Sequence, residues 1–129
     1  MQVRHILRDK GHDIISLPAT ATLAEAARIL SSRKIGAVVV KSKTGALAGI
    51  FSERDLVHAI ADKGAAALSE TIDDHMTSAP QTCAECDSVE VIMEVMTRGR
   101  FRHVPVLDEN GRLCGMVSIG DVVKTRIAE

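Results

Sequence analysis

An internal repeat constrains the fold of this chain more than any other feature of its sequence. When the 129 residues are compared with themselves at an offset of 66, residues 22–60 align with residues 88–126 without a gap. The chain therefore contains two copies of one structural unit. The identical residues gather in one part of each copy, and they are the pairs Val38/Val104, Val40/Val106, Gly45/Gly111, Leu47/Leu113, Gly49/Gly115, Ser52/Ser118, Asp55/Asp121 and Val57/Val123.

The hydrophobic pattern of each copy predicts a first helix with a recognisable start. In the first copy, Thr22 and Glu25 have the spacing of a capping box, so we expect a helix from there through Arg33. In the second copy, we expect Asp87 and Glu90 to play the same part. A short extended segment lies ahead of each copy, DIISL in one case and QTCAE in the other, and is expected to add an edge strand.

Two short apolar strands and a second helix follow in each copy. The strings AVVV and LAGIF, and their counterparts HVPV and LCGMV, predict pairs of buried strands joined by a turn that contains glycine. The last helices are expected to begin at SERD and at SIGD. The predicted order of elements is therefore β-α-β-β-α, twice.

Neither copy alone has enough surface to cover its own small sheet. We therefore expect a mixed α/β (α+β) fold in which two βαββα repeats pack sheet to sheet about a pseudo-twofold axis. A length of 129 residues is typical of one domain. The predicted organisation is a single module over residues 1–129, with the first repeat in residues 1–63 and the second in residues 70–129.

Charge and composition argue against several classes of partner. The 16 basic and 17 acidic residues leave a net charge of −1, and the chain has two phenylalanines but neither tyrosine nor tryptophan. We therefore expect no nucleic-acid partner, since such binding needs a basic surface or aromatic platforms for the bases. Apolar runs are all too short to span a membrane, so we expect no membrane partner and a cytoplasmic protein. An odd number of cysteines, three, fits a reducing compartment.

The strings GIFSERD and GMVSIGD place a serine and an aspartate three positions apart at the start of the last helix of each copy. This spacing is a helix-capping signature, and capping alone is one interpretation. The other helix starts use different residue pairs, however, and only these two combine Ser-x-x-Asp with a glycine three positions before the serine. We therefore favour ligand binding at both turns, which is compatible with capping when the site is empty.

With its repeat, its βαββα order and both Ser-x-x-Asp turns, the sequence resembles a tandem pair of CBS domains, also called a Bateman module. The strings GIFSERDLVHAI and RHVPVLDENGRLCGMVSIGD carry the resemblance, which covers nearly the whole chain. It implies a small stand-alone regulatory protein, not an enzyme, that senses an adenine nucleotide (AMP, ADP, ATP or NAD) in the cleft between the repeats. It further implies a homodimer, and a change of conformation that controls an unknown partner protein.

The resemblance also implies two sites, each of which combines the turn of one repeat with the lead segment and the second-strand entrance of the other. The aspartate would grip the ribose hydroxyls, while the serine and the helix N-terminus face the phosphate. The first implied site contains Ser52, Arg54, Asp55, Thr77, Thr82, Phe101, Arg102 and His103. The second contains Ser118, Gly120, Asp121, Ile15, Ser16, Ile35, Gly36 and Ala37.

The first of these sites is expected to bind phosphate more tightly. Arg54 and Arg102 supply forked guanidinium donors there, whereas the second site has Gly120 and Gly36 at the corresponding positions. Simpler interpretations stay open for two residues of the first site. Arg102 also fits a solvated helix exit, and His103 also fits a hydrogen-bonded histidine beside the core.

Two other classes of function remain alternatives. Cys83 and Cys86 form a C-x-x-C motif that, with a histidine, would suggest a metal or redox protein, although the second ligand pair of a typical zinc site is missing. A structural dimerisation domain without any ligand is the other alternative. The sequence contains no triad motif, P-loop or dinucleotide-binding fingerprint, so we expect no catalysis. It leaves open which nucleotide binds, how many sites are occupied and which protein is regulated.

Overall fold

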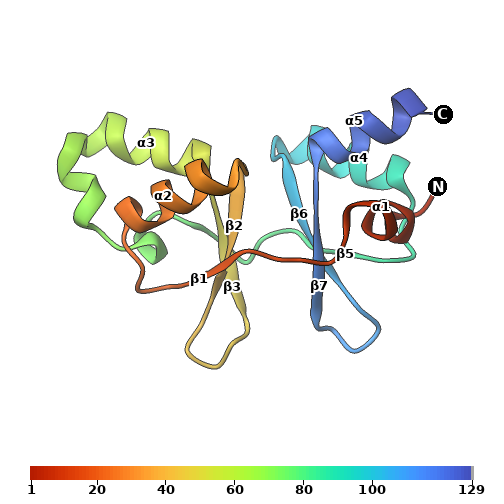
Figure 1. The fold of residues 1–129 in the computed structure, drawn as a ribbon, viewed down its shortest axis with the longest axis horizontal. Helices are drawn as coiled ribbons and strands as arrows, with labels where there is room; N and C mark the ends of the chain where they lie inside the picture. The colour runs from red at the N-terminus through yellow and green to blue at the C-terminus, as the bar shows by residue number, and fades with distance from the viewer. Residues whose placement is uncertain (129) are drawn as a thin grey trace. The chain divides into compact units, whose positions relative to one another are not determined.

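The computed structural model describes residues 1–128, with side chains described up to residue 125. This part of the chain forms two small sheets and five α-helices, which are divided between two compact units (Figure 1). The first-repeat unit comprises Ile15–Pro80, and the second-repeat unit comprises Met1–Ile14 together with the chain from Gln81 onward. The mixed α/β class expected from the repeat is confirmed. Packing of one sheet on the other stays a prediction.

The first-repeat unit is built on a four-stranded sheet with the order β1-β2-β3-β4. Strand β1 runs parallel to β2, and the other neighbours are antiparallel. The strands and helices expected in the first copy are confirmed, and a further short strand and two 3-10 helices occur in addition. In chain order the elements are β1 (Ser16–Pro18), α2 (Leu23–Arg33), β2 (Ala37–Lys41), β3 (Leu47–Ser52), α3 (Glu53–Lys63), the 3-10 helices η1 (Gly64–Ser69) and η2 (Ile72–Asp74), and β4 (Thr77–Ser78).

The second-repeat unit has the same plan with one strand fewer, and its sheet has the order β5-β6-β7. Strand β5 is parallel to β6, and β6 is antiparallel to β7. In addition to the expected elements it contains a helix from the start of the chain, α1. In chain order the elements are α1 (Val3–Lys10), β5 (Cys83–Ala84), α4 (Val89–Gly99), β6 (His103–Leu107), β7 (Leu113–Ser118) and α5 (Ile119–Ala128).

Each unit has its own apolar core. In both β2 and β6, alternate valines of the strand face the helices of the same unit, as the two-residue period of a strand requires. The buried core of the first-repeat unit includes Leu23, Leu30, Val38, Val40, Phe51 and Ile72. The buried core of the second-repeat unit includes Val3, Ile6, Leu7, Ile92, Met96, Val104, Val106 and Val117.

The segments that precede the two repeats are exchanged between the units. Helix α1, which lies ahead of the first repeat, buries Val3, Ile6 and Leu7 in the core of the second-repeat unit. The residues of β4 precede the second repeat but pair with β3 of the first. The compact units therefore divide the chain differently from the repeats, and the repeat boundaries at 1–63 and 70–129 stay a prediction.

The start of helix α4 differs from the sequence prediction. We expected Asp87 to cap this helix, but its N-cap is Ser88, whose Oγ accepts a hydrogen bond from the Val91 N–H at 3.2 Å. Asp87 belongs to the preceding turn, since its Oδ2 accepts from the Ala84 N–H at 2.8 Å. The repeat offset itself pairs Ser88 with Thr22, which caps α2 as predicted, so the signal was present in the sequence.

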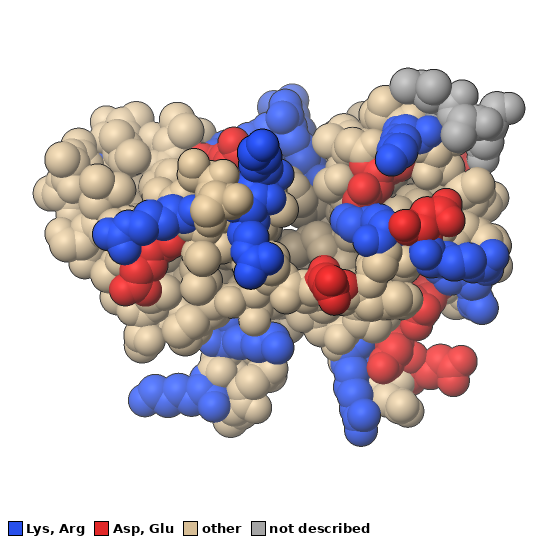
Figure 2. All heavy atoms as spheres, viewed as in Figure 1, with Lys and Arg blue, Asp and Glu red and all other residues tan. Residues whose placement is uncertain are grey.

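One pair of repeated glycines is explained by the hairpins that join β2 to β3 and β6 to β7. Gly45 and Gly111 have φ angles of 85° and 76°, in the left-handed region that only glycine adopts without steric cost. Among the described residues, no helix is both long enough and apolar enough to cross a lipid bilayer. Basic and acidic side chains are interspersed over the surface, in line with the small net charge (Figure 2).

Candidate functional site

The Ser-x-x-Asp turn of the first repeat joins β3 to α3. Ser52 is the N-cap of α3, and its Oγ accepts a hydrogen bond from the Asp55 N–H at 3.3 Å. In return, Asp55 Oδ2 accepts from the Ser52 N–H at 2.9 Å and from the Ser52 Oγ at 3.1 Å. The pair therefore forms a complete capping box, and the capping interpretation of the motif is confirmed.

The Ser-x-x-Asp turn of the second repeat has the same internal geometry. Asp121 Oδ2 accepts from the Ser118 N–H at 2.8 Å, and the Asp121 N–H donates to Ser118 Oγ at 3.2 Å. Thr125, one turn further along α5, donates its hydroxyl to the Asp121 carbonyl at 3.0 Å. Both copies therefore present a carboxylate beside a helix N-terminus that is already organised by its own serine.

A lysine distinguishes the two turns. Lys10, the last residue of α1, donates from Nζ to Asp121 Oδ2 at 2.8 Å and to the Met116 carbonyl at 2.9 Å. Burial acts to raise the pKa of Asp121, but the hydrogen bonds from Lys10 and Ser118 and the Lys10 charge outweigh it, so the pKa lies below its ordinary value. Sequence reasoning missed Lys10. The available signal was the apolar spacing of Val3, Ile6 and Leu7, which is typical of an amphipathic helix.

The entrance to the second strand lies beside the turn of its own repeat. In the first-repeat unit, Ala37 pairs with Ser52 in the sheet, and the Glu53 N–H donates to the Gly36 carbonyl at 3.0 Å. Ile35, the preceding residue, packs against the apolar core of the same unit. The resemblance assigned these three entrance residues to the site of the opposite turn, and that assignment stays a prediction.

The corresponding entrance in the second-repeat unit has the same arrangement. His103 pairs with Ser118, and the Ile119 N–H donates to the Arg102 carbonyl at 2.8 Å. The Arg102 side chain is exposed, whereas His103 is half-buried. Phe101 packs against the core of its unit, which favours a structural role for its ring.

The remaining predicted site residues lie on short strands and in first turns of helices. Ser16 of β1 pairs with Val39, and the Ile15 carbonyl accepts from the Val39 N–H at 3.0 Å. Thr77 is exposed on β4, and Thr82 is half-buried just before β5. Arg54 lies in the first turn of α3 and Gly120 in the first turn of α5, and both residues are exposed.

Gly120 stands where the first repeat has Arg54. A Cβ atom at Gly120 would meet only Ser118 Oγ, at an ordinary contact distance of 3.6 Å. The turn of the second repeat therefore has room for a side chain there. This turn lacks a guanidinium group because residue 120 is a glycine, and not because a side chain would clash there.

The glycines three positions before each serine have a packing explanation. A Cβ on Gly49 would lie 2.5 Å from the Thr77 carbonyl oxygen, and a Cβ on Gly115 would lie 2.7 Å from Cδ2 of Leu7. Real Cβ atoms do not approach other atoms so closely, so each glycine lets an exchanged lead segment lie against its strand. This part of the repeated motif therefore serves the fold.

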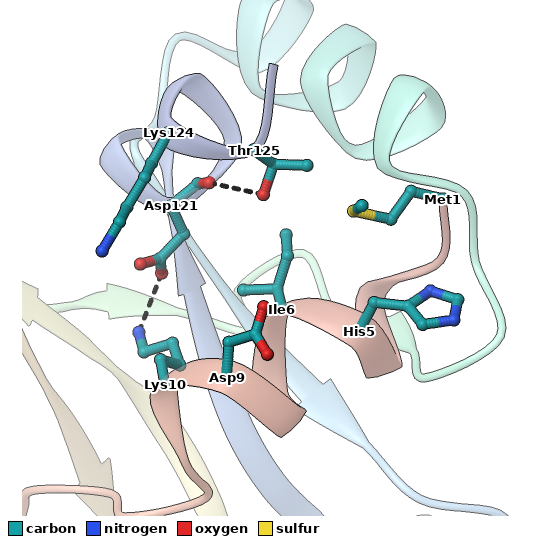
Figure 3. Close-up of a pocket in the computed structure, with 8 residues that line it drawn as sticks. All are labelled: Met1, His5, Ile6, Asp9, Lys10, Asp121, Lys124 and Thr125. Atoms are coloured by element: carbon teal, nitrogen blue, oxygen red, sulfur yellow. Dashed lines mark hydrogen bonds and ion pairs between the residues drawn. The ribbon is translucent and has the colours of Figure 1, made fainter. Parts of the chain in front are cut away.

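A cavity of about 240 Å³ lies in the second-repeat unit between α1 and α5 (Figure 3). Asp121 and Lys10 both line it, and Lys124 extends along the same wall as Asp121. The lining therefore combines charged groups, at the ion pair and at Asp9, with the apolar side chains of Met1 and Ile6. Its lining residues are Met1, His5, Ile6, Asp9, Lys10, Asp121, Lys124 and Thr125.

Two of the three cysteines, Cys83 and Cys114, belong to or pack against the core of the second-repeat unit. Burial raises the pKa of the Cys83 thiol to about 12 and that of the Cys114 thiol to about 11. Both thiols are therefore protonated at neutral pH, the form that does not attack disulfides. Cys86 is exposed and unpaired. Within the described residues, no group of three or more potential metal ligands comes together.

Comparison with known proteins identifies relatives over nearly the whole chain. The family model described as the CBS domain matches residues 3–62 and 72–127. The CBS domain-containing protein CBSX3, mitochondrial, of Arabidopsis thaliana is 36% identical, over 84% of this chain and 54% of that protein. The chain therefore spans about half the length of this curated relative.

Two solved structures match the fold along their lengths. The CBS-domain containing protein ATU1752 from Agrobacterium tumefaciens is 48% identical and superposes with a TM-score of 0.93, covering 97% of this chain and 92% of that one. The CBS domain protein PAE2072 from Pyrobaculum aerophilum, which was solved in complex with AMP, is 28% identical with a TM-score of 0.84 and covers 100% of both chains. These matches extend through both Ser-x-x-Asp turns.

Proposed function

Because this chain belongs to the CBS-domain family, we propose that it is a regulatory module that binds an adenine nucleotide and acts without catalysis. The observation that carries the proposal is the repeated turn, in which an aspartate carboxylate and a helix N-terminus lie side by side in both copies. A structural relative that was solved with AMP supports the same ligand class.

The chemistry of the Asp55 turn suits a ribose phosphate. Asp55 bonds to Ser52 through Oδ2 alone, and a carboxylate has about four acceptor positions, so two neighbouring hydroxyls have room to donate to it. The exposed N-terminal turn of α3 carries a partial positive charge that attracts phosphate. Arg54 lies in this turn, and its guanidinium group matches two phosphate oxygens at once.

The regulatory consequence follows from differential binding. A ligand shifts a conformational equilibrium only as far as it binds one state better than another, so the nucleotide must favour one state of the chain, which an unidentified partner protein then recognises. We also propose a homodimer. Val57 and Val123, at the same position of the two repeats, are exposed to 61% and 50%. The three free cysteines fit a reducing compartment such as the cytoplasm.

A thermal-unfolding panel tests the ligand class. AMP, ADP, ATP, NAD and S-adenosylmethionine are compared with GMP as the guanine control, for the wild type and for Asp55→Ala. A ligand present at a hundredfold excess over its Kd stabilises the native state by about 2.7 kcal/mol, which is a readily measured shift for a chain of this size. We expect a shift with adenine compounds only, and a much smaller one in the variant.

A structural dimerisation domain is the second candidate. The observation that favours it is that Ser52 and Ser118 each accept a hydrogen bond from an N–H group in the first turn of the following helix. Both helix starts are therefore capped without any ligand. If every compound of the panel leaves the unfolding temperature unchanged, ligand sensing fails and this second function becomes the better account.

A further inference from the structure

The two Ser-x-x-Asp turns share a pair of backbone-to-side-chain hydrogen bonds, but different segments lie against them. In the second-repeat unit that segment is α1, which ends at Lys10. In the first-repeat unit it is the stretch from Met76 to Pro80, which contains no charged residue. An ammonium group therefore contacts Asp121, and the segment that lies against the Asp55 turn has no counterpart of Lys10.

Lys10 is held at Asp121 by the fold. Helix α1 is fixed in the core through Val3 and Leu7, both fully buried, and its last residue is thereby directed at the turn. The Lys10 Nζ then uses two of its three donors, one on Asp121 Oδ2 and one on the Met116 carbonyl. The pair is half-covered, since the Lys10 side chain is 37% exposed and the Asp121 side chain 21%.

We infer that Lys10 is a built-in competitor for the Asp121 carboxylate, so that the Asp121 turn binds an adenine nucleotide only weakly and the Asp55 turn is the main site. This inference rests on the proposed function and deepens it by naming the residue that makes the two turns unequal. The Lys10 ammonium neutralises the charge of the Asp121 carboxylate and takes a position on its Oδ2. A neutral ribose hydroxyl therefore meets a weaker acceptor at Asp121 than at Asp55.

The surroundings of the ion pair indicate what happens when Lys10 loses its charge. Asp121 lines the cavity between α1 and α5, so its carboxylate stays accessible without Lys10 (Figure 3). Lys124 projects from α5 along the same wall and remains as a cation for a phosphate group. Removal of the Lys10 charge is therefore expected to open a second site.

Titration calorimetry with AMP tests the inference. The variant Lys10→Met keeps the aliphatic stem and removes the charge, and Lys10→Gln is a second version should the first fold poorly by circular dichroism. Arg8→Ala is the matched control, because it removes a positive charge from the exposed side of the same last turn of α1. We expect the wild type and Arg8→Ala to bind one AMP per chain. Both Lys10 variants are expected to bind a second AMP at the Asp121 turn. The affinity of this turn for AMP should be roughly tenfold or more higher than in the wild type.

The second site must depend on Asp121, so the double variant Lys10→Met/Asp121→Ala is expected to return to one AMP per chain. A folded Lys10 variant that binds one AMP as the wild type does overturns the inference but leaves the proposed function intact. A Lys10 variant that loses AMP also overturns it, since Lys10 then holds the ligand. If neither the wild type nor any variant binds AMP or shifts in the thermal panel, the proposed function itself fails, and the inference fails with it.

Discussion

Asp55 and Asp121 occupy the same position of the two repeats, and each exchanges the same pair of backbone-to-side-chain hydrogen bonds with its serine. Their different surroundings come from residues far away along the chain, because Asp121 also accepts a hydrogen bond from Lys10, at a sequence separation of 111. At the scale of single residues, identical motifs have therefore acquired unequal chemistry. Two predictions follow from this inequality.

Substitution of the two aspartates should separate the two turns. Asp55→Ala removes the carboxylate expected to hold two ribose hydroxyls, so the Kd for AMP should rise by about a hundredfold. Asp121→Ala should raise it by less than about threefold, as expected for a turn whose carboxylate is already neutralised by a lysine. Asp62→Ala, exposed on the same helix α3, is the control for loss of a negative charge. Equal losses in the two variants, measured by calorimetry, would show that the turns contribute equally.

The ion pair predicts a pH dependence of stability. The pKa of Asp121 in the folded protein lies below its ordinary value of 3.8, which it regains on unfolding. The stability from the ion pair is therefore complete above that value and is lost as the pH falls through the lower, folded pKa. Urea unfolding gives the free energy of unfolding of the wild type and of Lys10→Met between about pH 7 and pH 2. The difference between the two free energies should be constant at neutral pH and should shrink in acid. A difference that persists unchanged in strong acid contradicts this assignment.

At the scale of elements, the exchanged lead segments explain features that neither repeat explains alone. Helix α1 lies against β7 with Leu7 placed over Gly115, and the residues before and within β4 lie over Gly49 in the same way. The two repeats use different elements, a helix and a short strand, to cover the same position of the equivalent strand. Repetition of the glycine therefore reflects a shared need for close approach, not a shared ligand contact.

A double-mutant cycle tests the contact between α1 and β7. Leu7 is fully buried, so Leu7→Ala should destabilise the protein by about 2 to 5 kcal/mol. Gly115→Ala adds a Cβ atom that would lie 2.7 Å from Leu7 Cδ2, and it should cost about 1 to 3 kcal/mol. In the double variant the added methyl group fills the space left by the leucine. The loss of stability should therefore be smaller than the sum of the losses in the two single variants. Strict additivity in chemical denaturation would mean that the two residues do not meet.

At the scale of the whole molecule, two compact units with separate cores leave apolar side chains on the surface of their last helices. Val57 of α3 and Val123 of α5 are at corresponding positions, and Ile60 and Ile119 are each 40% exposed on the same two helices. Contiguous exposed apolar surface is typical of a contact with another protein. The repeat thus produces two matching candidate contact surfaces.

Charge substitutions on these helices test the proposed homodimer. The double variant Val57→Asp/Val123→Asp should shift the mass measured by light scattering from dimer to monomer, because burial of two unpaired carboxylates is unfavourable. Its stability as a folded chain should change by less than about 0.5 kcal/mol per site, as for other exposed positions. Val91→Asp, 49% exposed on helix α4, is the control. A dimer that survives the double variant must be formed by a different surface.

Much of the fold could be predicted because it depends on residues close together in the sequence. The repeat offset, the alternating valines of β2 and β6 and the capping residue Thr22 are local patterns, and the structure has the predicted strands and helices at those places. The Ser-x-x-Asp turns belong to the same class, since each closes its hydrogen bonds within three residues. Ser88 was missed for a local reason as well, because Asp87 is an equally good cap by residue type.

What the sequence by itself determined is thus the β-α-β-β-α order within each repeat and the two turns with the residues that cap them. Only the tertiary structure decided that α1 joins the second-repeat unit, that Leu7 requires Gly115 and that Lys10 pairs with Asp121. The physical reason is that hydrogen bonds of caps and hairpins are selected by near neighbours, whereas the docking of an amphipathic helix depends on which apolar surface is left uncovered elsewhere in the chain.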